Sequence, residues 1–178
     1  MYQEPQPDDV EVMEVGAATD GLPAAPSGWT DPLTGTDGPR LWDRVVSSEV
    51  ARVNRYHRPA TVVLVDVGGL DEFARAWGTE VAERLFIQLA RTMSVESRSS
   101  DHIARIDRTR FAILLTETDE IAAINFVERV RAACESLLRA PDLVRVGIGW
   151  ASPAGSTDLR AAIDVAEARV ADELKTPR

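Results

Sequence analysis

The sequence predicts an α+β domain whose central elements follow the order β-α-β-β-α-β, with an additional helix at each end. Two observations lead to this prediction. Apolar residues switch between helical and strand spacing along residues 39–175. In addition, two short strand patterns, near residues 102–106 and 110–116, are close enough in sequence to form a hairpin. A sheet of this order is antiparallel and ferredoxin-like, with its connecting helices on one face.

The first half of the domain is expected to contain a helix, a strand and two further helices. Apolar residues recur at helical spacing over about 39–57, and Pro39 suits a first helical turn. Residues 61–67 form a β-branched apolar run with the length of a buried strand. Gly78 then separates a short helix from a longer one.

The second half begins with the hairpin and continues with a helix over about 121–138. Residues 143–150 alternate cleanly between apolar and other side chains, as a strand does. A last helix over about 159–174 is expected to stop near Pro177. Trp42 and Trp77 are predicted to face the core from their helices.

Charge limits the partners of this 178-residue chain. Its net charge is −9, of which residues 1–30 contribute −6 through six acids and no base, leaving −3 for the remainder. Such a balance offers no overall attraction to nucleic acids or anionic membranes, so neither is expected as a partner. No run reaches the roughly 18–20 apolar residues of a membrane span. An anionic ligand would therefore need a local arginine cluster.

The chain is predicted to divide into a disordered acidic tail, residues 1–30, and one folded domain, residues 31–178. Four of the ten prolines lie in the tail, which has too little apolar surface to offset chain entropy. Deleting it should leave the thermal midpoint nearly unchanged. The start has no apolar leader, and the single cysteine, Cys134, suits a reducing compartment, so we expect a cytoplasmic protein. We expect no metal site and no cofactor, because His57 and His102 are isolated.

A set of short motifs occurs in a consistent order between Asp31 and Asp164. It resembles the GGDEF domain family of diguanylate cyclases, and the resemblance implies the nucleotide-cyclase-like form of the fold. The matching segments are Asp31-Pro-Leu-Thr-Gly35, Glu49-x-x-Arg52, Asp66-Val67, Gly78, Arg98-x-x-Asp101, Arg105, Val127-Glu-Arg-Val-Arg131 and Val146-Gly-Ile-Gly149.

The segment Arg105–Phe111 stands where the family has its signature hairpin, but its centre differs. Asp107, Arg108, Thr109 and Arg110 replace two glycines and two acids. The resemblance implies that active members hold two metal ions with acids at the positions of Asp66 and Thr109. A divalent ion about 5 Å from the Arg110 guanidinium would be repelled by roughly 6 kcal/mol at an effective dielectric near 20.

Other positions that the family uses for guanine and phosphate are Ala74, Glu83 and Ala171 here. The sequence therefore predicts a degenerate GGDEF domain that is not an enzyme. Asp66 and residues 107–110 would then be a vestigial active site with no catalytic residue.

One family site is predicted to be retained. Arg98 and Asp101 match the R-x-x-D motif of a regulatory site for cyclic di-GMP, a bacterial second messenger, and Arg129 matches an arginine that completes this site across a pair of domains. A guanidinium can bond the O6/N7 edge of guanine, and a carboxylate can accept from its N1–H and N2–H groups. The alternative is that these residues are ordinary surface charges of the scaffold.

The predicted function is regulatory. The domain would bind cyclic di-GMP and act in signal transduction through an unidentified protein partner. An alternative is a nucleotide-free module for protein interaction or homodimerisation, and a third is a residual diguanylate cyclase.

Overall fold

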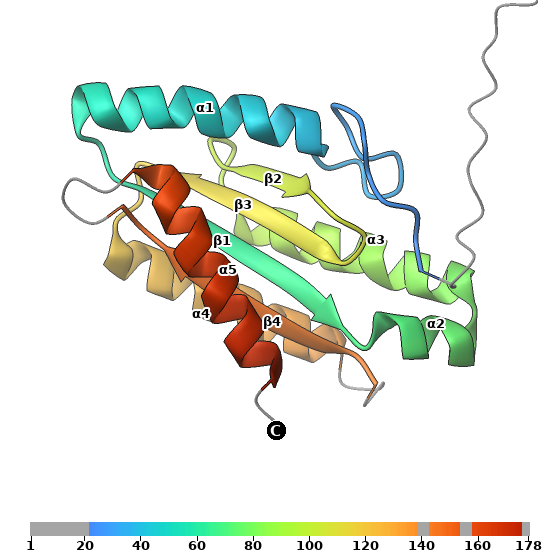
Figure 1. The fold of residues 1–178 in the computed structure, drawn as a ribbon. Coiled ribbons are helices and arrows are strands. Elements are labelled where there is room, and N and C mark those ends of the chain that lie inside the picture. Colours follow the sequence, from blue (N-terminus) through green and yellow to red (C-terminus); the bar gives the residue numbers. More distant parts are fainter. Residues whose placement is uncertain (1–21, 139–142, 154–157, 176–178) are drawn as a thin grey trace, which may run out of the picture.

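The computed structural model describes residues 22–138, 143–153 and 158–175 of the chain. One sheet lies between two helical layers (Figure 1). The layer on one face comprises α1 (Pro39–Tyr56) and α5 (Leu159–Lys175). The other face is covered by α2 (Leu70–Trp77), α3 (Thr79–Glu96) and α4 (Glu120–Leu137). Within the described residues, no helix is long and apolar enough to cross a membrane.

The sheet contains four strands in the order β2-β3-β1-β4, and every neighbouring pair is antiparallel. The strands are β1 (Ala60–Gly68), β2 (His102–Arg105), β3 (Arg110–Thr116) and β4 (Arg145–Ala151). The predicted fold class is therefore confirmed, including the helix at each end. Pairing between β1 and β3 sets Asp66 opposite Arg110, which brings the end of the first strand to the signature hairpin.

Strand β1 is buried on both faces, which explains its continuous apolar sequence. Val63 and Val65 pack into the cluster under α3 and α4, whereas Val62 and Leu64 pack under α1 and α5. Phe86 of α3 stacks on Phe111 of β3 with ring centroids 5.1 Å apart, so the hairpin strand is anchored to the first of these clusters.

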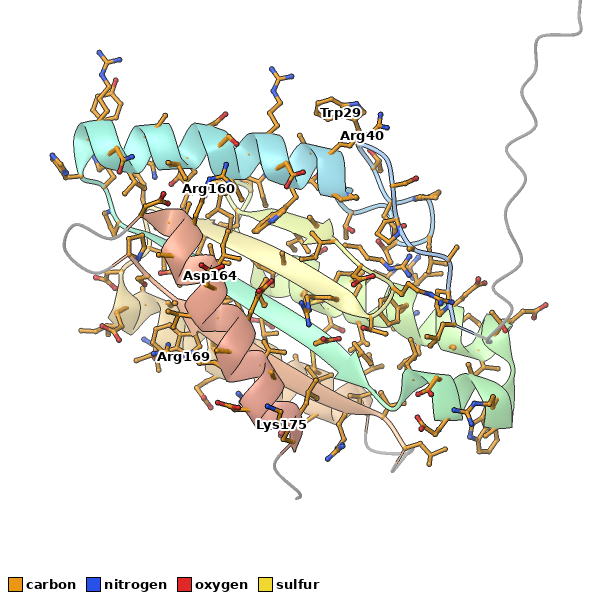
Figure 2. The ribbon with its side chains drawn as sticks, in the orientation of Figure 1. Trp29, Arg40, Arg160, Asp164, Arg169 and Lys175 are labelled. Carbon is orange, nitrogen blue, oxygen red and sulfur yellow. The ribbon has the colours of Figure 1, made fainter. Side chains whose placement is uncertain are left out.

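Helix α5 lies directly on the sheet because β4 carries glycine where the helix crosses it. A Cβ atom at Gly149 would lie 2.1 Å from the carbonyl oxygen of Ala166. The buried positions of α5 recur at helical spacing and include Ala162, Ala166 and Val170. Its exposed face carries the charged side chains of Arg160, Asp164, Arg169 and Lys175, as Figure 2 shows.

One expectation about an individual residue is wrong. Trp77 is 64% exposed rather than in the core, because it is the last residue of α2. Its ring lies beside that of Phe73, with the two ring centroids 6.5 Å apart. Residues 22–30, placed by the sequence in the tail, contact the domain: the Gly38 N–H donates to the Trp29 carbonyl at 2.8 Å beside the start of α1 (Figure 2). Residues 1–21 of the predicted tail lie outside the described residues.

Candidate functional site

The base of the signature hairpin is fixed by a buried ion pair. Arg105 at the end of β2 is 1% exposed and donates to the Asp31 carboxylate at 3.2 Å. Asp31 also accepts from the hydroxyl and the backbone N–H of Thr34, at 2.6 and 3.0 Å. The Arg105 guanidinium lies 5.0 Å from the centroid of Phe86. Burial lowers the pKa of Arg105, and the Asp31 charge opposes that shift. The Asp31 turn and Arg105 are therefore parts of the scaffold.

A second family motif is also structural. Glu49 of α1 is buried and accepts from the Arg52 Nε at 2.7 Å, and Arg52 reaches Glu117 beyond β3 at 3.1 Å. The hydrogen bond to Glu49 raises the pKa of Arg52. These contacts join α1 to the loop that follows β3.

The predicted vestigial residues separate into two groups. Asp66 accepts from the Thr109 hydroxyl at 2.8 Å, and from Nη2 and Nε of Arg110 at 2.8 and 3.2 Å. Asp107 instead accepts from the Arg108 N–H at 2.7 Å within the turn, and the Arg108 side chain extends to residues 22 and 23. Only Thr109 and Arg110 therefore act on Asp66.

The arrangement around Asp66 does not fit a pair of divalent ions. Donors from Thr109 and Arg110 occupy both carboxylate oxygens, and the guanidinium brings a positive charge to hydrogen-bonding distance. Divalent ions such as Mg²⁺ require oxygen ligands with negative charge. Within the described residues, no group of three or more His, Cys, Asp or Glu side chains could hold a metal ion.

At the opposite end of β2, the three residues of the predicted regulatory site line one small cavity. Arg98 and Asp101 lie in the connection from α3 to β2, and Arg129 projects from α4. One carboxylate oxygen of Asp101 accepts from the Arg98 N–H at 2.8 Å. The other, Oδ1, is buried and has no hydrogen-bond partner in the part of the chain that the structure describes.

The Arg129 guanidinium has partners on its own chain. Its Nε donates to the Glu96 carboxylate at 2.9 Å, and its Nη1 donates to the Asn125 carbonyl at 3.3 Å. It also lies 5.7 Å from the centroid of Phe126. Sequence reasoning missed Glu96, because the pair depends on how α3 and α4 pack, and no spacing in the sequence reveals that.

The cavity has a volume of about 30 Å³, which is room for about one or two water molecules. A purine base is too large to be enclosed there. A base at this position would lie at the mouth, against the exposed side chains of Arg98 and Arg129, with one edge toward Asp101.

The domain resembles solved structures. It matches the GGDEF domain of DgcB from Caulobacter crescentus in complex with c-di-GMP with a TM-score of 0.77 and 15% identity, covering 85% of this chain and 93% of that one. It also matches diguanylate cyclase SiaD from Pseudomonas aeruginosa, in complex with its activator SiaC, with a TM-score of 0.75 and 24% identity, covering 82% and 58%. At these identities the likeness shows the fold.

Curated relatives correct one prediction. The chain is 27% identical to the probable diguanylate cyclase DgcC of Escherichia coli strain K12 over 125 residues, which is 68% of this chain and 33% of that protein. The chain thus spans about a third of the length of the curated relatives it matches. Because these relatives are named diguanylate cyclases, our prediction that the chain is not an enzyme is contradicted. The changed residues of the hairpin do not by themselves exclude the activity.

The family match covers most of the domain. Residues 28–176 match the family described as "Diguanylate cyclase, GGDEF domain". This span contains the sheet and the five helices of the described residues. It also contains the cluster of Asp66, Thr109 and Arg110, which we call the Asp66 cluster, and the cavity lined by Arg98, Asp101 and Arg129. The chain therefore belongs to the GGDEF domain family of cyclic di-GMP signalling.

Proposed function

We propose that this GGDEF domain is a receptor that binds cyclic di-GMP at Arg98, Asp101 and Arg129 and acts through a protein partner. Asp101 carries the proposal. Its Oδ1 is a buried acceptor without a partner among the described residues, while Oδ2 is held by the Arg98 N–H. An unsatisfied buried acceptor is costly, so the Asp101 side chain gains free energy when it turns toward the mouth of the cavity and accepts from a ligand there. The N1–H and N2–H groups of guanine are suitable donors.

The two arginines complement this acceptor. The Arg98 side chain is exposed and can bond the O6/N7 edge of guanine or stack on the base. Arg129 is also largely exposed, although Glu96 holds it. A ligand phosphate would therefore compete with the Glu96 carboxylate for Arg129, and this competition limits the affinity. DgcB, which shares the fold, was solved in complex with c-di-GMP.

Calorimetric titration of the full chain with cyclic di-GMP tests the proposal. Arg98→Ala removes a charged, partly bidentate contact and should weaken binding roughly ten- to hundred-fold. Asp101→Asn keeps the shape but replaces one acceptor oxygen by a donor, so a similar loss is expected. Because the ligand carries phosphates, binding should also weaken as salt is added.

Arg110→Ala is the matched control, because Arg110 belongs to the Asp66 cluster at the other end of β2. It should leave the affinity unchanged. If only Arg110→Ala abolished binding, the ligand would lie beside Asp66 and the assignment of Arg98 would be wrong. If the unmodified chain showed no binding heat with excess ligand, the receptor proposal would fail in favour of a nucleotide-free interaction module.

The protein partner is proposed to contact exposed apolar side chains near the cavity. Val95 and Ile121 are 82% and 74% exposed, and each is next in sequence to a cavity residue, Glu96 or Ala122. A partner that contacts one of these side chains and the ligand site would bind differently when the ligand is present. Ile121→Glu should therefore weaken partner capture or self-association without changing the affinity for cyclic di-GMP.

Diguanylate cyclase activity is a second candidate, favoured by the names of the curated relatives. It would require Asp66 to be released from Arg110. The test is turnover of GTP by the full chain with Mg²⁺ or Mn²⁺, compared with Asp66→Asn. Product that disappears in the variant supports this candidate; equal product from both proteins, or none from either, removes it.

A further inference from the structure

Three consecutive backbone carbonyls, those of Leu22, Pro23 and Ala24, lie on the signature hairpin. We call these residues the strap. Arg105 Nη2 donates to the Ala24 carbonyl at 2.8 Å. Arg108 Nε and Nη2 donate to the carbonyls of Pro23 and Leu22, both at 3.2 Å. Hydrogen bonds from a charged donor are stronger than those between neutral groups, so the strap is held mainly by arginine.

The side chains of the strap also pack on the domain. Pro23 is buried, and Leu22 is partly buried against the core cluster beneath α3 and α4. The strap is thus docked through both its backbone carbonyls and its side chains. Local segments can open at a lower free energy than the whole domain.

Arg108 contacts the strap from within the turn of the hairpin. It stands at a signature position where the family has glycine, which has no side chain to reach the strap. Arg105 Nη2 also donates to the Arg108 carbonyl at 2.9 Å, and the Arg108 N–H is held by Asp107. The strap therefore bonds directly to the turn of the hairpin.

The next two residues of the hairpin hold Asp66 from the other side. Thr109 and Arg110 donate to its carboxylate, and the Val67 N–H donates to the Thr109 carbonyl at 3.0 Å. Contacts consequently run without a break from the strap through Arg108 to Thr109, Arg110 and the end of β1.

We propose that the strap is a latch that couples the N-terminal chain to the Asp66 cluster. With the strap docked, Arg108 fixes the turn and the turn holds Arg110 on Asp66. When the strap is withdrawn, the turn loses these bonds and Asp66 is released. The chain before the strap contains six acids and no base in residues 1–20. A partner with a basic surface would therefore bind this segment and could pull the strap off the hairpin.

Hydrogen–deuterium exchange of the full chain tests the latch with two variants that weaken it from opposite sides. Arg108→Ala removes the bonds to the Leu22 and Pro23 carbonyls from the hairpin side, and Leu22→Ala removes apolar packing from the strap side without changing the hairpin. Each should raise exchange about tenfold or more in residues 24–30, in residues 105–111 and at the Val67 amide. Arg75→Ala, which removes a surface arginine of α2, is the control and should change none of them.

Each remaining outcome overturns the latch. Faster exchange in residues 24–30 alone would mean that the strap does not hold the hairpin. No change in either segment would mean that these contacts do not control opening. A uniform increase across β1 and β4, as large as that in the strap and the hairpin, would make the strap part of the global unfolding unit rather than a latch.

Discussion

At the residue scale, Asp31 and Arg105 form a buried ion pair that holds two distant segments together. Both side chains are 1% exposed, and 74 positions separate them in the sequence. The motifs around each residue were visible in the sequence, but their pairing was not, because no local spacing connects the turn to the hairpin. By contrast, Arg98 and Asp101 share one short loop, and the family resemblance predicted Arg129 as the arginine that completes their site across a pair of domains; that Arg129 lines the same cavity within one chain depends on how α4 packs.

Asp31→Ala leaves the buried Arg105 guanidinium without its counter-charge. Removing one partner of a buried ion pair destabilises a protein by roughly 3–5 kcal/mol. A urea titration followed by circular dichroism should show a loss of this size. Asp71→Ala, which breaks a surface ion pair with Arg75, should leave the midpoint unchanged. Equal midpoints for all three proteins would show that Asp31 does not stabilise Arg105.

Cys134 should be unreactive in the folded protein. Burial raises the pKa of its thiol to about 11, so very little thiolate is present at pH 8. Mass spectrometry after iodoacetamide treatment should show modification at least a hundredfold slower than in denaturant. Between pH about 9 and about 11 the unfolded thiol ionises and the folded thiol does not, so stability should fall as pH rises through this window. Rapid labelling of the native chain would contradict the buried position.

At the element scale, hydrophobic periodicity predicted the helices and strands and their order, since each depends on nearby residues. The packing distance between elements could not be predicted in this way. The alternating pattern of residues 143–150 indicated a strand, but not that its glycines lie under a helix. The close approach of α5 to β4 at Gly149 appears only when both elements are in place.

Gly149→Ala should displace α5 from the sheet. The added methyl group would lie 2.1 Å from the Ala166 carbonyl oxygen, a backbone atom that can move only with the helix. Overpacking of this kind costs roughly 1–3 kcal/mol, and thermal unfolding should report it as a lower midpoint. Gly28→Ala is the control, because its methyl group would meet its nearest atom at an ordinary 3.5 Å. Similar midpoints for the two variants would show that α5 adjusts freely.

At the scale of the whole molecule, the question is at which residue the folded domain begins. Composition placed this boundary at Asp31, because residues 22–30 are rich in proline, glycine and alanine and show no periodicity. Residues 22–24 are held instead by hydrogen bonds from Arg105 and Arg108, which are distant in the sequence. Composition does not reveal such bonds. We propose that residues 22–30 belong to the domain.

Deleting residues 1–30 should therefore destabilise the protein, contrary to the expectation from composition. The deletion removes the acceptors of Arg105 and Arg108 in the strap and the Trp29 carbonyl that accepts from Gly38. The loss of several hydrogen bonds, at about 1 kcal/mol each, should lower the thermal midpoint by roughly 5 °C or more. An unchanged midpoint in differential scanning calorimetry would mean that residues 22–30 do not stabilise the domain and that it begins at Asp31.

The strand order also dictates when this protein can fold during its synthesis. Strand β1 is made early but lies between β3 and β4, and β4 ends at Ala151. A nascent chain that has reached only Thr116 can form the β2-β3-β1 part of the sheet. Without β4, one edge of β1 is unpaired, and without α5 the apolar side chains beneath that helix are exposed. Such exposed edges promote aggregation, and pairings distant in sequence form slowly. We therefore expect ribosome-bound chains halted before Arg145 to be protease-sensitive and to need chaperones, with protection gained only once α5 has emerged.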